Sequence, residues 1–228
     1  MPAGGTLTVR HGRLRRGDRY ADTPRADRQF LARVGAILRL RERGRFHLHA
    51  AGVADPAGRA WLLAGENGSG KSTLAYALVR QGWKLIGDDG VIIERGPTGM
   101  IVHAWREPLA VSRALAADFP ELAGVAPPPD FHDERHRVPM RFPVAQRASV
   151  AALVFLRRGE RDLLEPMPPA EALTLLVKQS AWVLMNDGHS ALHLAALREL
   201  VAQTPLFRLT HTSRQLHEIA ATLTAAIP

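Results

Sequence analysis

Residues 65–73 of this chain have the types and the spacing of a phosphate-binding loop. Their sequence, Gly-Glu-Asn-Gly-Ser-Gly-Lys-Ser-Thr, fits the pattern G-x-x-x-x-G-K-[ST]. Glycines let successive backbone N–H groups turn inward around phosphate oxygens, which a Cβ atom would obstruct. Lys71 is expected to reach the β- and γ-phosphates, and the Ser72 hydroxyl to bind Mg²⁺. The residues expected to hold the nucleotide are Gly65, Asn67, Gly68, Ser69, Gly70, Lys71, Ser72 and Thr73.

A strand and a helix are expected to position this loop. The apolar run at residues 60–64 predicts a buried strand that leads into it, and residues 72–79 have the pattern of a helix that leads out. The N-terminus of that helix would place the positive end of its dipole beneath the phosphates. A chance glycine loop does not explain this order of elements, so the sequence predicts triphosphate binding.

Two adjacent carboxylates, Asp88 and Asp89, follow the next apolar strand, at residues 83–87. The carboxyl end of a strand is where open α/β sheets place their ligand crevice. Adjacent residues of an extended chain point to opposite sides, so the two carboxylates should have different roles. The alternative is an Asp-Asp-Gly turn that only closes a hairpin, but such a turn does not explain the short interval from the loop.

The composition limits the class of protein. A chain of 228 residues that is 46% apolar can bury one substantial core. Because cysteine is absent, disulfides, thiolate nucleophiles and cysteine-bound zinc are excluded. The start of the chain lacks the apolar core of a signal peptide, and the longest apolar stretch, residues 148–156, is too short to span a bilayer. We therefore expect a cytoplasmic protein without membrane association.

The net charge of +8 is concentrated near the start, where residues 1–49 hold 12 arginines and four acidic residues. A basic segment can attract nucleic acid or an acidic protein. Because no aromatic residues are interleaved with the arginines, nucleic-acid binding is not expected. We expect residues 1–45 to form a basic strand and helix arm packed on a domain of residues 46–228. A homo-oligomer remains an open alternative.

Hydrophobic patterns predict the other elements. Two hairpins are expected, one joining strands 46–53 and 60–64, the other joining strands 91–94 and 99–104. Residues 124–143 contain three consecutive prolines and many charges, which predicts a long loop that acts as a lid. The remaining expected elements are helices at 27–43, 109–117, 170–184, 190–203 and 213–226 and strands at 6–9, 150–156 and 206–209.

Residues 46–94 resemble the kinase domain of bacterial HPr serine kinase/phosphorylase and, more distantly, phosphoenolpyruvate carboxykinase. The resemblance rests on His49 in an apolar strand sixteen residues before Gly65, on the loop itself, and on Leu-Ile-Gly-Asp-Asp-Gly-Val at 85–91. Its most specific mark is the single helix and strand between the loop and the aspartate pair. The resemblance implies an α/β fold: a P-loop phosphoenolpyruvate carboxykinase/HPr-kinase-like mixed sheet with flanking helices. The chain has a short basic arm where that family has a separate amino-terminal domain.

The resemblance also implies ATP- and Mg²⁺-dependent transfer of the γ-phosphoryl group to a hydroxyl. It makes Asp88 the general base, puts Asp89 with Ser72 in the Mg²⁺ shell, and places His49 beside Asp88. His47, on the same face of the strand as His49, is a possible supporting partner. The expected acceptor is a serine of a peptide or protein. A kinase of a small hydroxyl compound, such as a free amino acid, and a nucleotide-dependent switch without transfer chemistry are the alternatives.

Phosphoryl transfer needs positive charge around the transferred group and around an acidic or phosphate-bearing substrate. Three arginines are placed to supply it, one at the end of the strand that closes the second hairpin and two in the expected lid. They are Arg106, Arg137 and Arg141.

Overall fold

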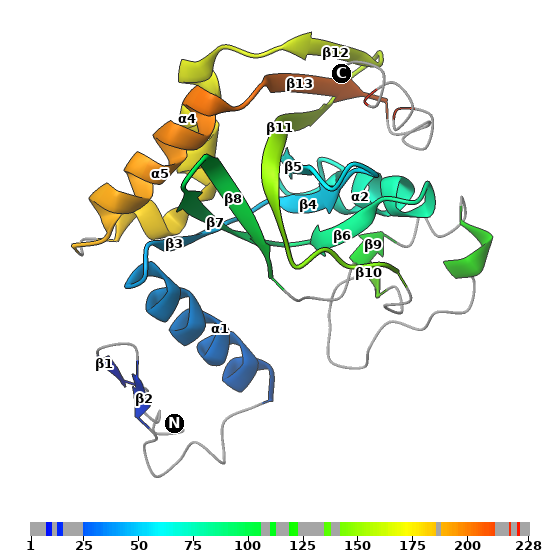
Figure 1. Cartoon of the computed structure of the whole chain (residues 1–228). Helices are drawn as coiled ribbons and strands as arrows, with labels where there is room; N and C mark the ends of the chain where they lie inside the picture. Colours follow the sequence, from blue (N-terminus) through cyan, green and yellow to red (C-terminus); the bar gives the residue numbers. More distant parts are fainter. Residues whose placement is uncertain are drawn as a thin grey trace.

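The computed structural model describes residues 8–10, 13–15, 25–105, 110–112, 119–122, 135–137, 142–185 and 188–212, together with Ile219 and Leu223. Its centre is a curled mixed sheet of nine strands with helices on both faces (Figure 1). The main path of the sheet runs in the order β3 (Arg45–Leu48), β7 (Val91–Gly96), β8 (Gly99–Ala104), β11 (Arg147–Arg158), β5 (Ala60–Ala64), β4 (Ala51–Ala54) and β6 (Lys84–Gly87). Strand β13 (Leu206–His211) also pairs with β11, and β12 (Leu163–Pro166) pairs with β13.

Strand β11 joins the two parts of the sheet. Its first residues, Arg147 to Ser149, pair antiparallel with β8. From Val150 the strand pairs in parallel with β5 on one edge, with an irregularity between Val150 and Ala152, and from Leu153 it pairs in parallel with β13 on the other. The carboxyl ends of β5, β11 and β13 therefore point the same way, and this edge of the sheet carries the candidate site.

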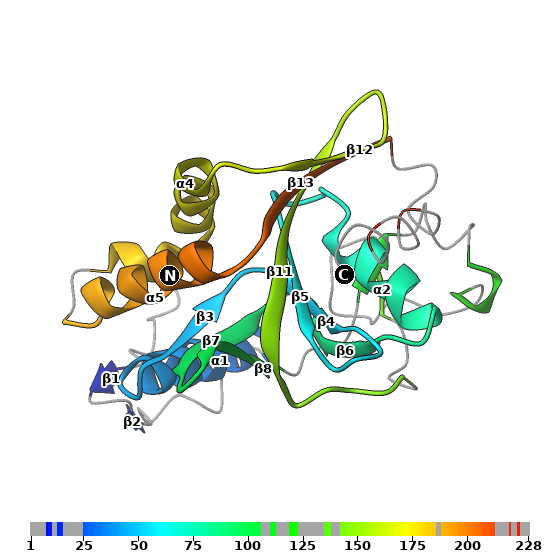
Figure 2. The same cartoon turned by 45° about the horizontal axis from the view of Figure 1, so that its top comes forward.

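The two faces of the sheet hold two apolar clusters, separated by the alternation of side chains along each strand. In β5, Trp61 and Leu63 pack with α2 (Lys71–Arg80), whereas Leu62 and Ala64 pack on the opposite side. That opposite face is covered by α4 (Pro169–Gln179) and α5 (Ser190–Gln203), as Figure 2 shows. A short 3₁₀ turn, η3 (Ala181–Leu184), lies between α4 and α5 in the chain. A second one, η2 (Pro120–Leu122), contributes Leu122 to the apolar cluster on the α2 side.

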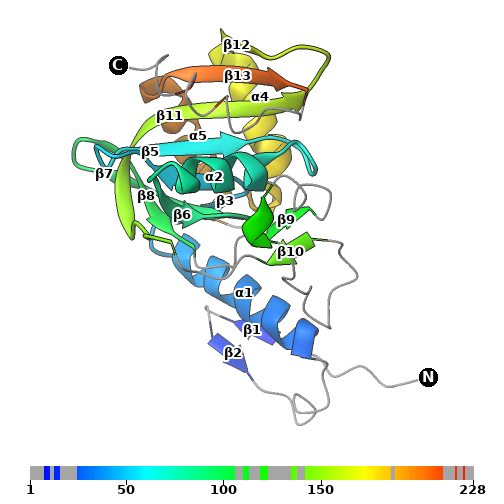
Figure 3. The same ribbon diagram turned by 90° about the vertical axis from the view of Figure 1, so that its right-hand side faces the viewer.

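The amino-terminal elements extend from one side of the sheet (Figure 3). Strands β1 (Thr8–Arg10) and β2 (Arg13–Arg15) form an antiparallel pair, and α1 (Arg25–Arg41) runs back to β3. The last residue of α1, Arg41, is only 1% exposed. It donates to the backbone carbonyl of Trp182 and lies with Nη1 3.3 Å from His193 Nδ1. This buried guanidinium ties the carboxyl end of α1 to the α4–α5 side of the core.

Most of the predicted elements are confirmed, including both hairpins, the strand–loop–helix unit and the strands at 150–156 and 206–209. The helix predicted at 170–184 ends at Gln179 and continues as a 3₁₀ turn. Ile219 and Leu223 are helical and buried, as the last predicted helix requires. Most of that helix, and residues 6–7 of the first strand, lie outside the described residues.

Two predictions at the residue level are wrong. The strand expected at 46–53 is interrupted at His49 and Ala50, because β3 pairs with β7 whereas β4 pairs with β5 and β6. The helix expected at 109–117 is contradicted at Ala110–Ser112, which form strand β9 and pair with β10 (Arg135–Arg137). Pairing between distant segments here outweighs the local helical pattern. The same pairing places β10 inside the expected lid at residues 124–143. The lid residues 124–134 and 138–141 lie outside the described part.

None of the helices in the described part of the chain has both the length and the apolar character needed to cross a membrane.

Candidate functional site

The glycine-rich loop lies between the end of β5 and the start of α2. Gly65, Gly68 and Gly70 have φ values of 147°, 78° and 95°, which residues with a Cβ rarely adopt. A Cβ on Gly65 would also lie 2.6 Å from both the Leu156 carbonyl oxygen and Ser69 Oγ, whereas one on Gly68 would meet nothing within 4 Å. The loop is thus packed tightly on β11 at its first residue and open at its centre.

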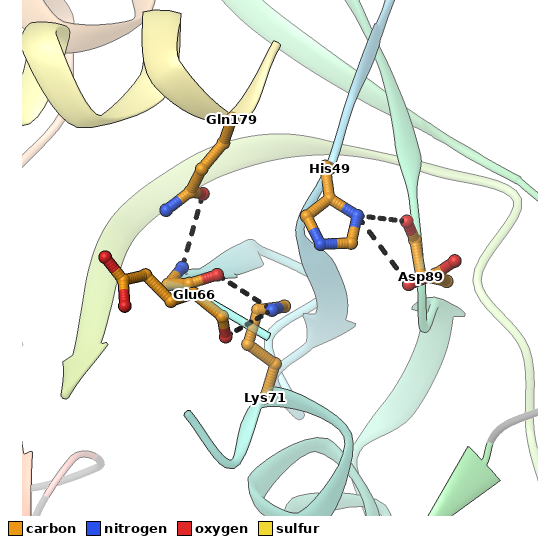
Figure 4. Close-up of polar contacts among 6 residues, drawn as sticks. His49, Glu66, Lys71, Asp89 and Gln179 are labelled. Carbon is orange, nitrogen blue, oxygen red and sulfur yellow. Dashed lines mark hydrogen bonds and ion pairs between the residues drawn. The ribbon is translucent and has the colours of Figure 1, made fainter. Parts of the chain in front are cut away.

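Lys71 is folded over the beginning of this loop. The residue is 7% exposed, and its Nζ donates to the carbonyl oxygens of Gly65 at 2.8 Å and Glu66 at 3.1 Å (Figure 4). A neutral carbonyl is a weaker partner for an ammonium group than an anionic phosphate oxygen is. The ammonium is therefore held where a phosphate group could replace the two carbonyls.

The loop is held from the other side by His211, a residue that the sequence did not single out. This histidine ends β13, is 0% exposed, and lies with Nε2 2.7 Å from the Ser69 carbonyl oxygen. Since a carbonyl only accepts, Nε2 carries the proton. The local sequence indicated only an apolar strand near His211. Its hydrogen-bond partner, Ser69, is 142 residues away in the chain.

Replacing His211 by phenylalanine should loosen the loop. The buried Ser69 carbonyl would lose its donor, which should lower the free energy of unfolding by about 1–3 kcal/mol. Urea unfolding measures this loss, and His211→Gln, whose amide nitrogen can reach the same carbonyl, should recover part of it. Equal stability of wild type and His211→Phe would show that the hydrogen bond contributes nothing to holding the loop.

The aspartate pair follows β6, and its two residues differ in exposure. Asp88 is 3% exposed, whereas the side chain of Asp89 is 53% exposed. His49 Nδ1 lies 3.0 Å from the Asp89 carbonyl oxygen and 3.6 Å from Asp89 Oδ1 (Figure 4). His49 was expected beside Asp88, and the contact described here is instead with Asp89. Because the carbonyl requires a proton on Nδ1, Nε2 of the neutral ring is left as an acceptor.

His47 and two glycines support the turn that carries the aspartates. The His47 ring packs edge-on against Trp105, and its Nε2 lies 2.2 Å from where a Cβ on Gly90 would be. Gly87 is equally confined, since its Cβ would lie 2.2 Å from the Gly90 carbonyl oxygen. Burial, reinforced by the nearby His49 and Arg33 and opposed by Asp89, lowers the pKa of His47 to about 4.

This shift in the pKa of His47 predicts a loss of stability in acid. The folded value of about 4 lies below the unfolded value of 6.5, so the unfolded chain binds more protons between them. Stability should therefore fall as pH drops from 6.5 to 4, and His47 should contribute at most about 3 kcal/mol of that fall. Urea unfolding of wild type and His47→Gln across this range measures the difference. Parallel pH curves for the two proteins would contradict the shifted pKa.

The donors around the loop suit Mg²⁺, which prefers oxygen ligands and usually binds with substrate phosphates. Ser72 is the second residue of α2, directly after Lys71, and the Asp88–Asp89 turn has two carboxylates. Within the described residues, no three histidine, aspartate or glutamate side chains are grouped closely enough to hold a metal without such help. The Ser72 hydroxyl and the aspartate carboxylates are the kinds of donor that a magnesium ion shared with a bound nucleotide would take.

The side chains of the three arginines predicted to bind substrate lie outside the part of the chain that the structure describes. Arg106 and Arg141 lie outside the described residues. Arg137 has a described backbone, in β10, but not a described side chain. Their assignment to substrate stays a prediction.

Comparison with known proteins shows similarity to solved structures. No protein-family model matches the chain, and no curated protein matches it. Among solved structures, the chain is similar to the HPr(Ser) kinase/phosphatase from Coxiella burnetii, with a TM-score of 0.45 and 15% sequence identity. The similarity covers 79% of this chain and 94% of that one.

Proposed function

We propose that this chain is an ATP- and Mg²⁺-dependent kinase of the HPr-kinase type, with the P-loop fold of that family. It transfers the γ-phosphoryl group to a hydroxyl, and we assign a serine of a cytoplasmic peptide or protein as the acceptor. The observation that carries the proposal is the position of Lys71. Its ammonium is held at the start of a glycine-rich loop, at the carboxyl edge of a sheet that also presents the aspartate pair.

The proposed reaction uses the residues in separate roles. Asp88, shielded from solvent, takes the proton of the acceptor hydroxyl as the oxygen attacks the γ-phosphorus. The bond from that phosphorus to the β–γ bridging oxygen breaks, and ADP is the leaving group. Lys71 and the loop amides hold the phosphate oxygens while charge is redistributed among them.

Asp89, His49 and Ser72 complete the proposed site. Ser72 and Asp89 would hold Mg²⁺, which when bound neutralises charge on the phosphate oxygens. His49 fixes the backbone of Asp89 through its Nδ1 proton and presents Nε2 as an acceptor. We propose that it orients the aspartate turn toward the transferred group.

The proposal is tested by searching for the acceptor. ATP labelled in its γ-phosphate is incubated with the full chain and with separate pools of peptides, proteins and small hydroxyl compounds from the source cell. We expect label in the peptide or protein pool, released as phosphoserine on acid hydrolysis. Label found only in the small-molecule pool would show that the acceptor is a small hydroxyl compound and not a peptide or protein. Tight ATP binding without any labelled acceptor would favour a nucleotide-dependent switch.

A further inference from the structure

A cavity of about 520 Å³ lies between the tip of the β7–β8 hairpin, the start of β11 and the carboxyl end of α5 (Figure 1). Its volume is within the range of about 300–1,000 Å³ typical of small-molecule sites. In the hairpin, Val91 pairs with Ala104 and Gly96 with Gly99, so the tip is at the opposite end from the aspartate turn. From Val91 to Gly96 the strand spans about 17 Å, at about 3.4 Å per residue. The cavity is therefore separate from the candidate site.

Two opposite charges meet in the lining of this cavity. Arg95, in β7, pairs through its Nε with Oε2 of Glu199, in α5. The side-chain amide of Gln203 donates to Glu199 Oε1 at 3.1 Å. The Glu199 side chain is 18% exposed, whereas that of Arg95 is 64% exposed. The carboxylate is thus held in place on its own helix, and the guanidinium reaches it from the hairpin.

This ion pair keeps the capacity to bind further charged groups. A guanidinium has five N–H donors, and a carboxylate has about four acceptor positions. Arg95 can therefore bind a second carboxylate, and Glu199 an ammonium group, while the pair itself stays formed. The carboxyl end of α5, at Gln203, adds partial negative charge that favours the ammonium. A ligand that carries one charge of each sign fits both residues, whereas a ligand with a single charge meets a like charge.

The rest of the lining adds hydroxyl groups and apolar surface. Thr98 and Ser149 are exposed, and their hydroxyls both donate and accept hydrogen bonds. Apolar surface comes from Pro97, Ile101 and Val150, none of which is fully buried. Such a lining suits a small ligand in which a charged end is joined to an apolar side chain.

We propose that this cavity binds an α-amino acid with an apolar side chain. The carboxylate of the ligand binds the Arg95 guanidinium, its ammonium binds the Glu199 carboxylate, and its side chain contacts Ile101 and Val150. Because the cavity is separate from Asp88, the bound amino acid is not the phosphoryl acceptor. It links the β7–β8 hairpin to α5, and the inference stands independently of the proposed kinase function.

The test is calorimetry of the full chain with L-valine, L-leucine, L-methionine and L-phenylalanine near neutral pH, where each is a zwitterion. We expect at least one of them to bind with a Kd of about 1 mM or tighter. Arg95→Met and Glu199→Gln each remove one charge and keep most of the side-chain volume. Each should weaken this binding about 10–100-fold, the loss expected for a charge-assisted hydrogen bond. Arg198→Met, which is exposed on α5 and outside the cavity lining, should bind as wild type does.

Two analogues of the bound amino acid test the two charges separately. The N-acetyl form lacks the ammonium and the amide form lacks the carboxylate, so each should bind wild type about tenfold more weakly or worse. Glu199→Gln should lose the preference for the amino acid over its N-acetyl form. Arg95→Met should lose the preference for the amino acid over its amide. A general loosening of the fold does not produce this crossed pattern.

Three results would overturn the inference. The first is that wild type binds none of the four amino acids. The second is that the N-acetyl form binds wild type as tightly as the amino acid itself, a comparison that needs no variant. The third is that binding is unchanged in both Arg95→Met and Glu199→Gln, because the ligand would then lie elsewhere. None of these measurements involves ATP, so each leaves the proposed function as it is.

Discussion

Asp88→Asn should still bind ATP but transfer the phosphoryl group about 10²–10⁴-fold more slowly than wild type, the usual size of a general-base contribution. Asparagine keeps the shape of the side chain but does not take the acceptor proton. Removing a carboxylate beside the phosphates also removes a like charge, so ATP affinity should stay the same or rise slightly. Because Asp88 is buried, the variant is first checked for an unchanged free energy of unfolding.

Asp89→Asn is the matched control for this experiment. The neighbouring side chain is exposed and is assigned to the metal, so its loss should be partly rescued by excess Mg²⁺. Asp88→Asn should not respond to added metal. Equal transfer by wild type and Asp88→Asn would remove Asp88 from the chemistry. If Asp89→Asn lost transfer activity that excess Mg²⁺ did not restore, while Asp88→Asn stayed active, Asp89 would be the general base and Asp88 the metal ligand.

Lys71→Ala should weaken ATP binding and reduce turnover by about 10²–10³-fold, because the phosphate oxygens lose a charged donor that acts in a water-poor site. The buried ammonium also bridges the carbonyls of Gly65 and Glu66, so its removal loosens the start of the loop. Calorimetry with ATP and with tripolyphosphate measures the binding loss, and transfer of labelled phosphate measures turnover.

Lys178→Ala is the control for Lys71→Ala. Lys178 is exposed, in the last turn of α4, and its removal takes the same charge from the chain without touching the loop. It should leave ATP binding and transfer unchanged. If Lys71→Ala bound ATP and turned over as wild type does, the assignment of residues 65–73 as a phosphate-binding loop would fail.

Sequence patterns were sufficient to predict the parts of the fold in which neighbouring segments of the chain contact each other. The strand–loop–helix unit and the hairpin of β7 and β8 are built from segments adjacent in sequence, and their apolar periodicity marks them. The interruption between β3 and β4 at His49 could not be predicted in this way. Residues 46–53 form one apolar run, and only pairing with different partner strands divides it.

The same distinction holds for the candidate site, where residues close in sequence could be predicted and distant ones could not. The loop glycines, Lys71 and the aspartate turn lie in one stretch of the chain whose spacing has chemical meaning. His211 and Gln179 reach the loop from far along the chain, and neither stands in a motif. The packing of His47 against Gly90 is also invisible in sequence, because it depends on how closely β3 and the turn after β6 approach each other.

The central position of β11 has a consequence for the synthesis of the protein on the ribosome. Residues 60–80 of the strand–loop–helix unit emerge early, but β5 stays without one sheet neighbour until residues 150–155 have been made. The strand that completes the other edge of β11 comes later still, at residues 206–211, and brings the histidine that holds Ser69. Until then the nascent chain carries open strand edges, the state most prone to aggregation. A chain released before residue 206 would keep the whole glycine-rich segment yet lack the His211 contact that supports it, so the loop reaches its final shape late in translation.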